Sequence, residues 1–312
     1  MSCFLLEFRF DFGITMDINI TNFKPEYSQK ILSLINSQDS NFTQDNVISE
    51  TLLTQMISIP DSNPEKDCYV ISNKEDIIGF VQLIHESPIS RTVLKFWISD
   101  NVEKNQIFTM IIKKIELKFR SLDSKFFHIQ IPENSYESIL MKNNWNRIKT
   151  YITLKLPLSS SPIFKIDPQL KITNLKFESD ETDLTNLQNI CFQNNWGFSP
   201  NSVNQISYRI RMENCSPQGI VFIESENKKI AYNWTLLNEN NKTGLISMIG
   251  VHPEFQGKGI GKQILLAGLK SLYNRGAKIV SLEVDSENEN AMNLYKKIGF
   301  AEDQKNIWFE FI

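Results

Sequence analysis

The chain has 312 residues, of which 41% are hydrophobic and 22% are charged, and its formal net charge is −3. These values are typical of a globular protein with about two domains. The slightly acidic balance excludes an overall basic field that would draw the chain to nucleic acid or to an anionic membrane surface. No apolar run approaches the roughly 20 residues of a membrane span.

The cysteines and histidines are scattered along the chain. Cys3, Cys68, Cys191 and Cys215 form no C-x-x-C pair, and no histidine stands at metal-ligand spacing from them. We therefore expect free thiols, no metal site, and a reducing compartment, the cytoplasm. Residues 1–15 lack a basic leader, and we expect an N-terminal extension to which the sequence assigns no role.

The first half is predicted to be a mixed α/β domain over residues 16–157. It opens with an alternating strand at 18–22, and helical stretches follow at 26–36 and 45–57. A hairpin then pairs 69–72 with 77–84. A strand at 93–98, a long helix, a strand at 126–131, a last helix and a C-terminal hairpin complete the order.

The second half repeats this order. A proline- and serine-rich segment at 156–162 separates the halves, and we assign 158–168 as a linker. Residues 169–312 then form the second predicted domain. Its helices are expected at 180–192 and 201–212, and a hairpin pairs 220–224 with 230–236. Further strands are expected at 170–174, 245–251 and 278–284. Val251 corresponds to Ile98, and Phe300 corresponds to Trp145, so matched residues of the two halves are separated by nearly the same number of positions. This nearly constant offset indicates a duplicated domain.

A glycine-rich loop, Gln256–Gly261, lies between the strand at 245–251 and the long helix of the second half. Its three glycines permit a tight turn and remove side chains that would block a ligand. The backbone N–H groups at the helix N-terminus favour phosphate oxygens, and Lys258 and Lys262 add positive charge. A Walker loop is excluded because Gln263 stands where Ser or Thr is needed, and the spacing G-x-G-x-G is not that of a dinucleotide fingerprint.

A second motif lies in the last predicted helix. It runs from Asn288 to Phe300, and Ala291, Leu294 and Tyr295 share one helical face. Gly299 is placed to end the helix in a left-handed cap.

Together, the two segments resemble the signature motifs of the GNAT N-acetyltransferase superfamily, Gln/Arg-x-x-Gly-x-Gly/Ala and Asn-x-x-Ala-x-x-Leu-Tyr-x-x-x-Gly-Phe. The detailed resemblance covers about 245–312. The order of elements extends it over the second half and, more loosely, over the first, as in the tandem members of the superfamily that include mycothiol synthase. The resemblance implies two tandem GNAT-like domains. Each would be a mixed, mostly antiparallel sheet flanked by helices, with splayed central strands.

The resemblance also implies a site. Acetyl-CoA would be the acyl donor, wedged between the strands at 245–251 and 278–284. The amide near Ile249 would polarise the thioester carbonyl, and Tyr295 would protonate the departing thiolate. The implied donor-binding residues are Met248, Ile249, Val251, Gln256, Gly257, Lys258, Gly259, Ile260, Gly261, Lys262 and Asn288. Two alternatives remain open, because Tyr295 also fits a core position and Asn288 is a favoured helix N-cap.

The general base is less well defined. An amine must lose a proton to form an amide, and a carboxylate usually accepts it. Several superfamily members carry a glutamate on the fourth strand, but 245–251 holds no carboxylate. Glu283 on the fifth strand is our candidate base, and Glu224 on the second strand is the other; either can be an exposed strand charge. The segment Trp196–Pro200 either lines the acceptor site or packs between helices.

The first half has lost the donor-binding motif. Its segment Glu103–Phe108 has no glycine, and Leu140 replaces Tyr295. We therefore expect one donor site per chain and transfer of an acetyl group to the primary amine of a small molecule or peptide. No metal, nucleic acid or membrane partner is expected, and the halves could form a pseudo-dimer within a monomer. The alternative function is a non-catalytic acyl-CoA sensor or scaffold.

Overall fold

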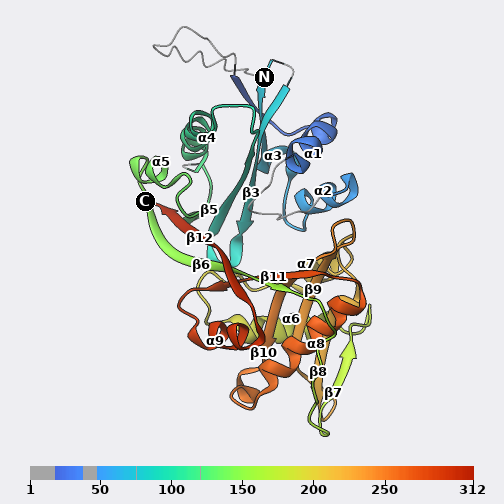
Figure 1. Cartoon of the computed structure of the whole chain (residues 1–312). Coiled ribbons are helices and arrows are strands. Elements are labelled where there is room, and N and C mark those ends of the chain that lie inside the picture. The colour runs from blue at the N-terminus through green and yellow to red at the C-terminus, as the bar shows by residue number, and fades with distance from the viewer. Residues whose placement is uncertain (1–17, 38–47, 75, 120) are drawn as a thin grey trace. The chain divides into compact units, whose positions relative to one another are not determined.

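A computed structural model describes residues 18–37, 48–74, 76–119 and 121–312 (Figure 1). It divides the chain into two compact units: residues 1–148 with 308–312, and residues 149–307. The N-terminal extension assigned to residues 1–15 lies outside the described residues.

The first unit is built on a mixed sheet with the strand order β1-β2-β3-β4-β5, next to the end of β12. These strands are β1 (Ile18–Asn22), β2 (Cys68–Asn73), β3 (Asp76–Glu86), β4 (Arg91–Ile98), β5 (Phe126–Pro132) and β12 (Ala301–Phe311). Neighbours from β1 to β4 are antiparallel, whereas β4 and β5 are parallel. The observed sheet therefore has the mixed architecture expected from the sequence.

Helices flank this sheet on two sides (Figure 1). They are α1 (Ser28–Asn36), α2 (Glu50–Ile57), α3 (Pro64–Asp67), α4 (Lys104–Phe119) and α5 (Glu137–Lys142). The Ser49 hydroxyl accepts a hydrogen bond from the N–H of Leu52, so α2 begins at a side-chain N-cap. The helix predicted at 45–57 therefore begins at Glu50, since Ile48 and Ser49 are not helical, and positions 45–47 of that prediction lie outside the described residues.

The second unit repeats the plan with the strand order β12-β6-β11-β10-β9-β8-β7. Its further strands are β6 (Trp145–Pro157), β7 (Lys171–Asn174), β8 (Ile220–Ser225), β9 (Lys228–Asn238), β10 (Thr243–Val251) and β11 (Ile279–Asp285). Only β10 and β11 are parallel among the pairings described from β6 to β7. The parallel pair follows from the long helix that connects the two strands.

Strands β6 and β12 are each shared between the two units, so the boundary between the units differs from the one predicted from the sequence. Residues 149–157 of β6 pair with β11 from Asp285↔Tyr151 to Ile279↔Pro157 and belong to the second unit. Conversely, residues 308–312 belong to the first unit. The units thus divide at Ile148/Lys149, whereas the proline-serine segment placed the boundary after residue 157. A linker composition locates a loop, but it does not state which sheet the preceding strand joins.

Four helices cover the second sheet. Helices α8 (Ile260–Asn274) and α9 (Glu289–Ile298) share a buried cluster with β11 that includes Leu269, Leu282 and Tyr295. Helices α6 (Glu181–Phe192) and α7 (Val203–Arg209) share another with β8 and β9 that includes Leu187 and Phe222. Burying a side chain of this size stabilises the fold by about 2 kcal/mol. The two faces of the sheet are therefore covered by different helix pairs.

The parallel strands of each unit pair over only part of their length. In the second unit, β10 and β11 pair from Thr243↔Ile279 to Leu245↔Ser281. Beyond that point β10 continues to Val251 and β11 to Asp285 without further pairing between them. A register shift against β9 between Ile246 and Met248 sets Ser247 in a bulge at the same level. A bulge bends its strand, which accounts for the splay.

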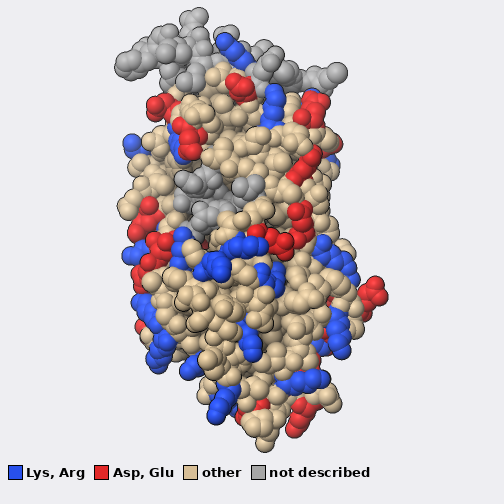
Figure 2. Space-filling view, turned by 45° about the vertical axis from the view of Figure 1, so that its right-hand side comes forward, with Lys and Arg blue, Asp and Glu red and all other residues tan. Residues whose placement is uncertain are grey.

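Two further features concern membrane-spanning helices and surface charge. Among the described residues, no helix has the length and apolar character needed to cross a membrane. On the face drawn in Figure 2, basic and acidic side chains are interspersed, in keeping with the net charge of −3.

Candidate functional site

The glycine-rich loop lies where β10 ends and α8 begins. Gly257 and Gly259 have φ values of +75° and +78°, in the left-handed region that favours glycine. A Cβ atom added at either position would meet no atom within 4 Å. The outer surface of the loop is therefore open rather than packed against the protein.

Backbone donors line this open surface. Within residues 121–312, no protein acceptor is assigned to the N–H groups of the six consecutive residues 257–262. The first assigned bond of the helix is Gln263 N–H to the Gly259 carbonyl, at 3.4 Å. An α-helix leaves about four such donors at its start, and the partial positive charge there favours an anion. The loop therefore has the chemistry of a phosphate-binding site.

Side-chain hydrogen bonds to backbone carbonyl groups stabilise the loop. The Gln256 amide donates to the Val251 carbonyl at 3.0 Å, and the Lys258 ammonium donates to the Glu254 carbonyl at 3.0 Å. Ring atom Nδ1 of His252 accepts a weak bond of 3.4 Å from the N–H of Glu254. His252 thus caps the turn that follows β10. Lys262 is exposed on the first turn of α8.

Gly261 brings the two sequence motifs together. A Cβ on Gly261 would lie 3.7 Å from Leu294 Cδ2 and 4.0 Å from Val251 Cγ2. The adjacent Ile260 side chain is buried in the core between α8 and β8–β9. The first turn of α8 is therefore anchored by an apolar side chain, and its glycine faces both the end of β10 and α9.

The predicted donor-binding residues of β10 divide between the faces of the sheet. Ile249 and Val251 pack with the α8 cluster, whereas Met248 packs with the α6–α7 cluster. Gly250 lies between them, and its missing side chain leaves room for Tyr232 and Cys191: an added Cβ would be 2.9 Å from a carbon of each. Hence any larger residue at position 250 would displace one of these side chains.

The predicted site residues Asn288 and Tyr295 lie at the start of α9 and on its buried face, respectively. The Asn288 side chain accepts a bond of 3.1 Å from the N–H of Ala291, so it caps α9. Tyr295 is 7% exposed, and its ring meets Phe300 edge-on at 5.8 Å. Burial raises the pKa of the Tyr295 phenol to about 12, so the phenol is protonated throughout the neutral range.

The two candidate bases are far apart in the sheet order. Glu283 is an exposed residue of β11, on the face opposite to Leu282 and Val284. It is two residues beyond Ser281, the last β11 residue paired with β10. Glu224 instead accepts a hydrogen bond of 2.7 Å from Thr173 at the β7–β8 edge, with β9 and β10 between it and β11. Of the two, Glu283 is therefore the one that lies at the splay.

The structure adds residues around Glu283 that sequence analysis did not single out. Asn306 of β12 is 7% exposed and donates to Glu283 Oε1 at 2.7 Å and to Thr153 Oγ1 at 3.2 Å. Nearby, Tyr151 of β6 lies opposite Asp285, and its ring centre is 6.4 Å from that of Trp196. Strand alternation could have placed Asn306 on one face of β12, but its partner depends on the register of three strands.

The corresponding region of the first unit is filled with aromatic rings. Phe96 of β4 and Phe108 of α4 stand in the places of Ile249 and Gly261, and Tyr136 precedes α5 as Asn288 precedes α9. The Phe108 ring lies 4.2 Å from the Tyr136 ring and 4.8 Å from the Phe96 ring, centre to centre. Phe108 is 0% exposed, as is Leu140, the counterpart of Tyr295. Side chains thus occupy the space that glycine leaves open in the second unit.

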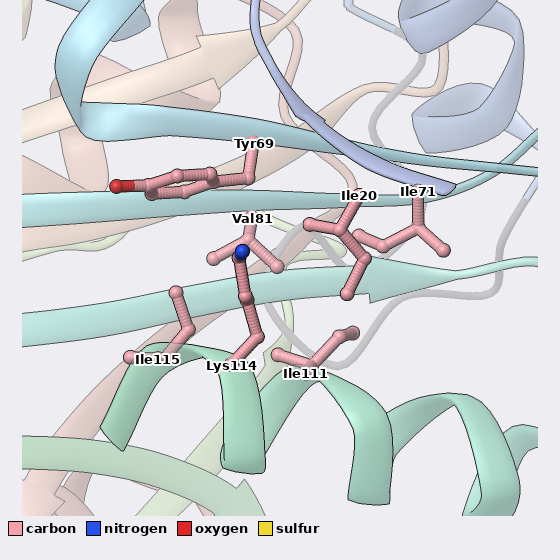
Figure 3. A pocket seen from close by; sticks show the side chains of 7 residues that line it. All are labelled: Ile20, Tyr69, Ile71, Val81, Ile111, Lys114 and Ile115. Atoms are coloured by element: carbon pink, nitrogen blue, oxygen red, sulfur yellow. The ribbon is translucent and has the colours of Figure 1, made fainter. Parts of the chain in front are cut away.

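A separate pocket of the first unit is lined mostly by aliphatic side chains of the sheet and α4 (Figure 3). It encloses no space large enough for a water molecule. It therefore offers no ligand site.

The thiols and potential metal ligands show no further site. Burial raises the pKa values of Cys68 and Cys191 to about 12 and that of Cys215 to about 11, so these thiols are protonated at neutral pH. Within the described part of the chain, no group of three His, Cys, Asp or Glu side chains could hold a metal ion.

A mixed sheet with splayed parallel strands, and a glycine-rich loop with exposed backbone donors between the first of them and the next helix, is the arrangement that the sequence resemblance implies for an acetyltransferase fold. Residues 182–300 match the family model described as "Acetyltransferase (GNAT) family". Over these residues, which lie within the second unit, the chain is similar to the GNAT acetyltransferase family.

Relatives and solved structures agree with this assignment. A mycothiol acetyltransferase of Thermomonospora curvata is 26% identical over 166 residues, which are 53% of this chain and 56% of that protein. The match thus spans about half the length of the relative.

A GCN5-related N-acetyltransferase from Sphaerobacter thermophilus aligns over 94% of this chain and 95% of its own, with a TM-score of 0.71 and 13% identity. A tandem GNAT protein from the clavulanic acid biosynthesis pathway covers 94% and 98%, with a TM-score of 0.73 and 12% identity. These likenesses confirm the tandem fold predicted from the sequence.

Proposed function

We propose that the protein is an acetyl-CoA-dependent N-acetyltransferase whose acceptor is the primary amine of a small molecule or peptide. The observation that carries this proposal is the parting of β10 and β11 after Leu245↔Ser281, next to a loop with six backbone donors that have no assigned acceptor. A pantetheine arm needs a narrow slot with free strand edges, and a pyrophosphate needs converging N–H groups. Both lie in the second unit.

The donor would bind along β10. The pyrophosphate would accept hydrogen bonds from the amides of residues 257–262, with Lys258 and Lys262 adding positive charge. The Ile249 amide would face the thioester carbonyl and stabilise negative charge on its oxygen. Gln256 would act indirectly, since its side chain is engaged with the Val251 carbonyl.

The acetyl group would pass directly from sulfur to nitrogen. The amine nitrogen forms a bond to the carbonyl carbon, the C–S bond breaks, and the sulfur leaves with the electron pair. Glu283 would accept the proton lost by nitrogen, and Tyr295 would donate a proton to the thiolate. Solvent returns the proton from Glu283 to Tyr295, which restores both groups.

The opposite placement of these two groups supports this division of roles. Tyr295 belongs to the buried cluster on the α8–α9 face, whereas Glu283 projects from the other face of β11. An acyl group held between the splayed strands is open to both faces. One side chain can then donate a proton to the thiolate while the other accepts a proton from the amine.

The decisive experiment is a screen of primary amines with acetyl-CoA, in which release of free thiol is followed. We expect turnover with at least one of the amino sugars, polyamines, amino acids or peptide N-termini in such a screen. Tight CoA binding with no thiol release above background on the whole panel would favour the alternative, an acyl-CoA sensor or scaffold.

The aromatic cluster of the first unit predicts a single donor site per chain. Phe96, Phe108 and Tyr136 fill the space between β4 and α4 that a second cofactor would need. Calorimetric titration of the full chain with CoA is therefore expected to saturate at one equivalent. Two equivalents bound with equal affinity would contradict this prediction.

A further inference from the structure

The face of β6, β11 and β12 that lies opposite to α8 and α9 carries Glu283 and its hydrogen-bond partner Asn306. Glu283 lies two residues beyond Ser281 on β11, and Ser247 lies two residues beyond Leu245 on β10, so both directly follow the last pair of the two strands. Its carboxylate is therefore located where the two strands part, and where an amine would meet the acyl group. A hydrogen bond from β12 fixes the position of this exposed side chain.

Asn306 holds the Glu283 carboxylate through an oriented amide. Its Nδ2 atom donates to Glu283 Oε1 at 2.7 Å and to Thr153 Oγ1 at 3.2 Å. Its Oδ1 atom accepts from Gln304 Nε2 at 2.8 Å. Turning the amide over would point its oxygen at a carboxylate oxygen, so the observed orientation is fixed from both ends. Asn306 is 7% exposed, whereas the carboxylate that it holds is exposed to solvent.

Charged neighbours around this pair are largely matched with one another. On β6, Lys149 pairs with Asp285 at 3.1 Å, and Lys155 pairs with Asp303 of β12 at 3.2 Å. Lys149 also contacts Glu287, and Tyr151 of β6, another titratable residue, lies opposite Asp285. The hydrogen bond that Asn306 donates to Glu283 comes from a neutral group. A neutral donor orients a carboxylate without adding a fixed charge that would compete with an incoming ammonium group.

We propose that Asn306 is a positioning residue that holds the Glu283 carboxylate at the opening between β10 and β11, so that it accepts the proton of the acceptor amine. This role rests on the proposed acetyltransferase function. Asn306 touches neither donor nor acceptor and acts through Glu283. The carboxylate takes the proton from nitrogen as the N–C bond forms, and Asn306 keeps it within reach.

The role is tested by a double-mutant cycle. Asn306→Ala is expected to lower kcat by about tenfold to 100-fold, since a general base contributes about 100-fold or more when it is well placed. In a Glu283→Gln background, the same substitution is expected to have no further effect on kcat, because the group on which it acts is gone. An equal loss in both backgrounds would assign Asn306 a purely structural part and overturn the proposal.

A pH profile adds a readout that a structural role would not change. Asn306→Asp places a second carboxylate beside Glu283, so the base would hold its proton to higher pH. We expect the acid limb of kcat/KM to move up by about one pH unit. An acid limb that stays at the wild-type pH would count against the role. Asn238→Ala removes an asparagine that caps the β9–β10 turn through Asn240, and it serves as a matched control with an unchanged profile.

The outcomes separate this proposal from the function on which it rests. Calorimetric titration with CoA checks that each variant is folded and keeps the donor site. Wild-type protein that releases no thiol with any amine overturns the acetyltransferase proposal and this role together. Wild-type turnover that Asn306→Ala leaves unchanged overturns the positioning role alone.

Discussion

Replacing Tyr295 by phenylalanine is expected to lower kcat for acetyl transfer by about 100-fold to 10,000-fold while CoA binding is retained. The ring packs against Phe300 in the α8–α9 core, and phenylalanine preserves that packing. Only the hydroxyl is lost, and with it the proton offered to the thiolate. Burial raises the pKa of this phenol to about 12, so it is available as a donor throughout the neutral pH range. Thiol release and calorimetry measure the two effects separately.

Tyr273→Phe provides the matched control. Tyr273 belongs to α8 and packs against the same buried cluster as Tyr295. Its hydroxyl has no part in the proposed chemistry, so wild-type kcat is expected. If Tyr295→Phe also retained wild-type kcat, Tyr295 would be a core tyrosine and the thiolate would take its proton from elsewhere.

Replacing Gly261 by phenylalanine is expected to weaken CoA binding by at least about 100-fold, since hydrogen bonds to a charged group are worth about 1.5–3 kcal/mol each. The change copies into the second unit the residue that the first unit carries as Phe108. A side chain at position 261 starts 3.7 Å from Leu294 and 4.0 Å from Val251, so a ring would fill the space between β10 and α9. Calorimetric titration with CoA measures the loss.

Lys270→Phe is the control for a ring added to the same helix. Lys270 is exposed in the middle of α8, away from the N-terminal turn that carries the donor loop. We expect this variant to bind CoA as the wild type does. Undiminished binding by a folded Gly261→Phe variant would show that the donor does not use this turn.

Much of the second unit could be predicted from the sequence because the signals are local. Glycines at 257, 259 and 261 predicted an open turn before a helix, and the positive φ values of the first two follow from that chemistry. Asn288 was expected to be either a donor ligand or an N-cap, and its bond to Ala291 shows the cap. The repeated order of strands and helices likewise predicted the tandem fold, which comparison with known structures confirms.

Sheet order and register decided the rest. The sequence placed β6 wholly in the first half, but residues 149–157 pair with β11, because a strand's partner depends on the whole chain and not on the linker that follows it. The contact between Glu283 and Asn306 spans 23 residues and requires β11, β6 and β12 to lie in register. Likewise, the loss of glycines from Glu103–Phe108 was visible in the sequence, but the stacking of Phe108 on Tyr136 was not. The sequence by itself predicted the resemblance to the acetyltransferase family, the open glycine-rich loop and the repeated order of elements, since these depend on local residue patterns. Only the tertiary structure decided where the two strands part, which face Glu283 occupies and what holds it there, since those depend on contacts between residues distant in sequence.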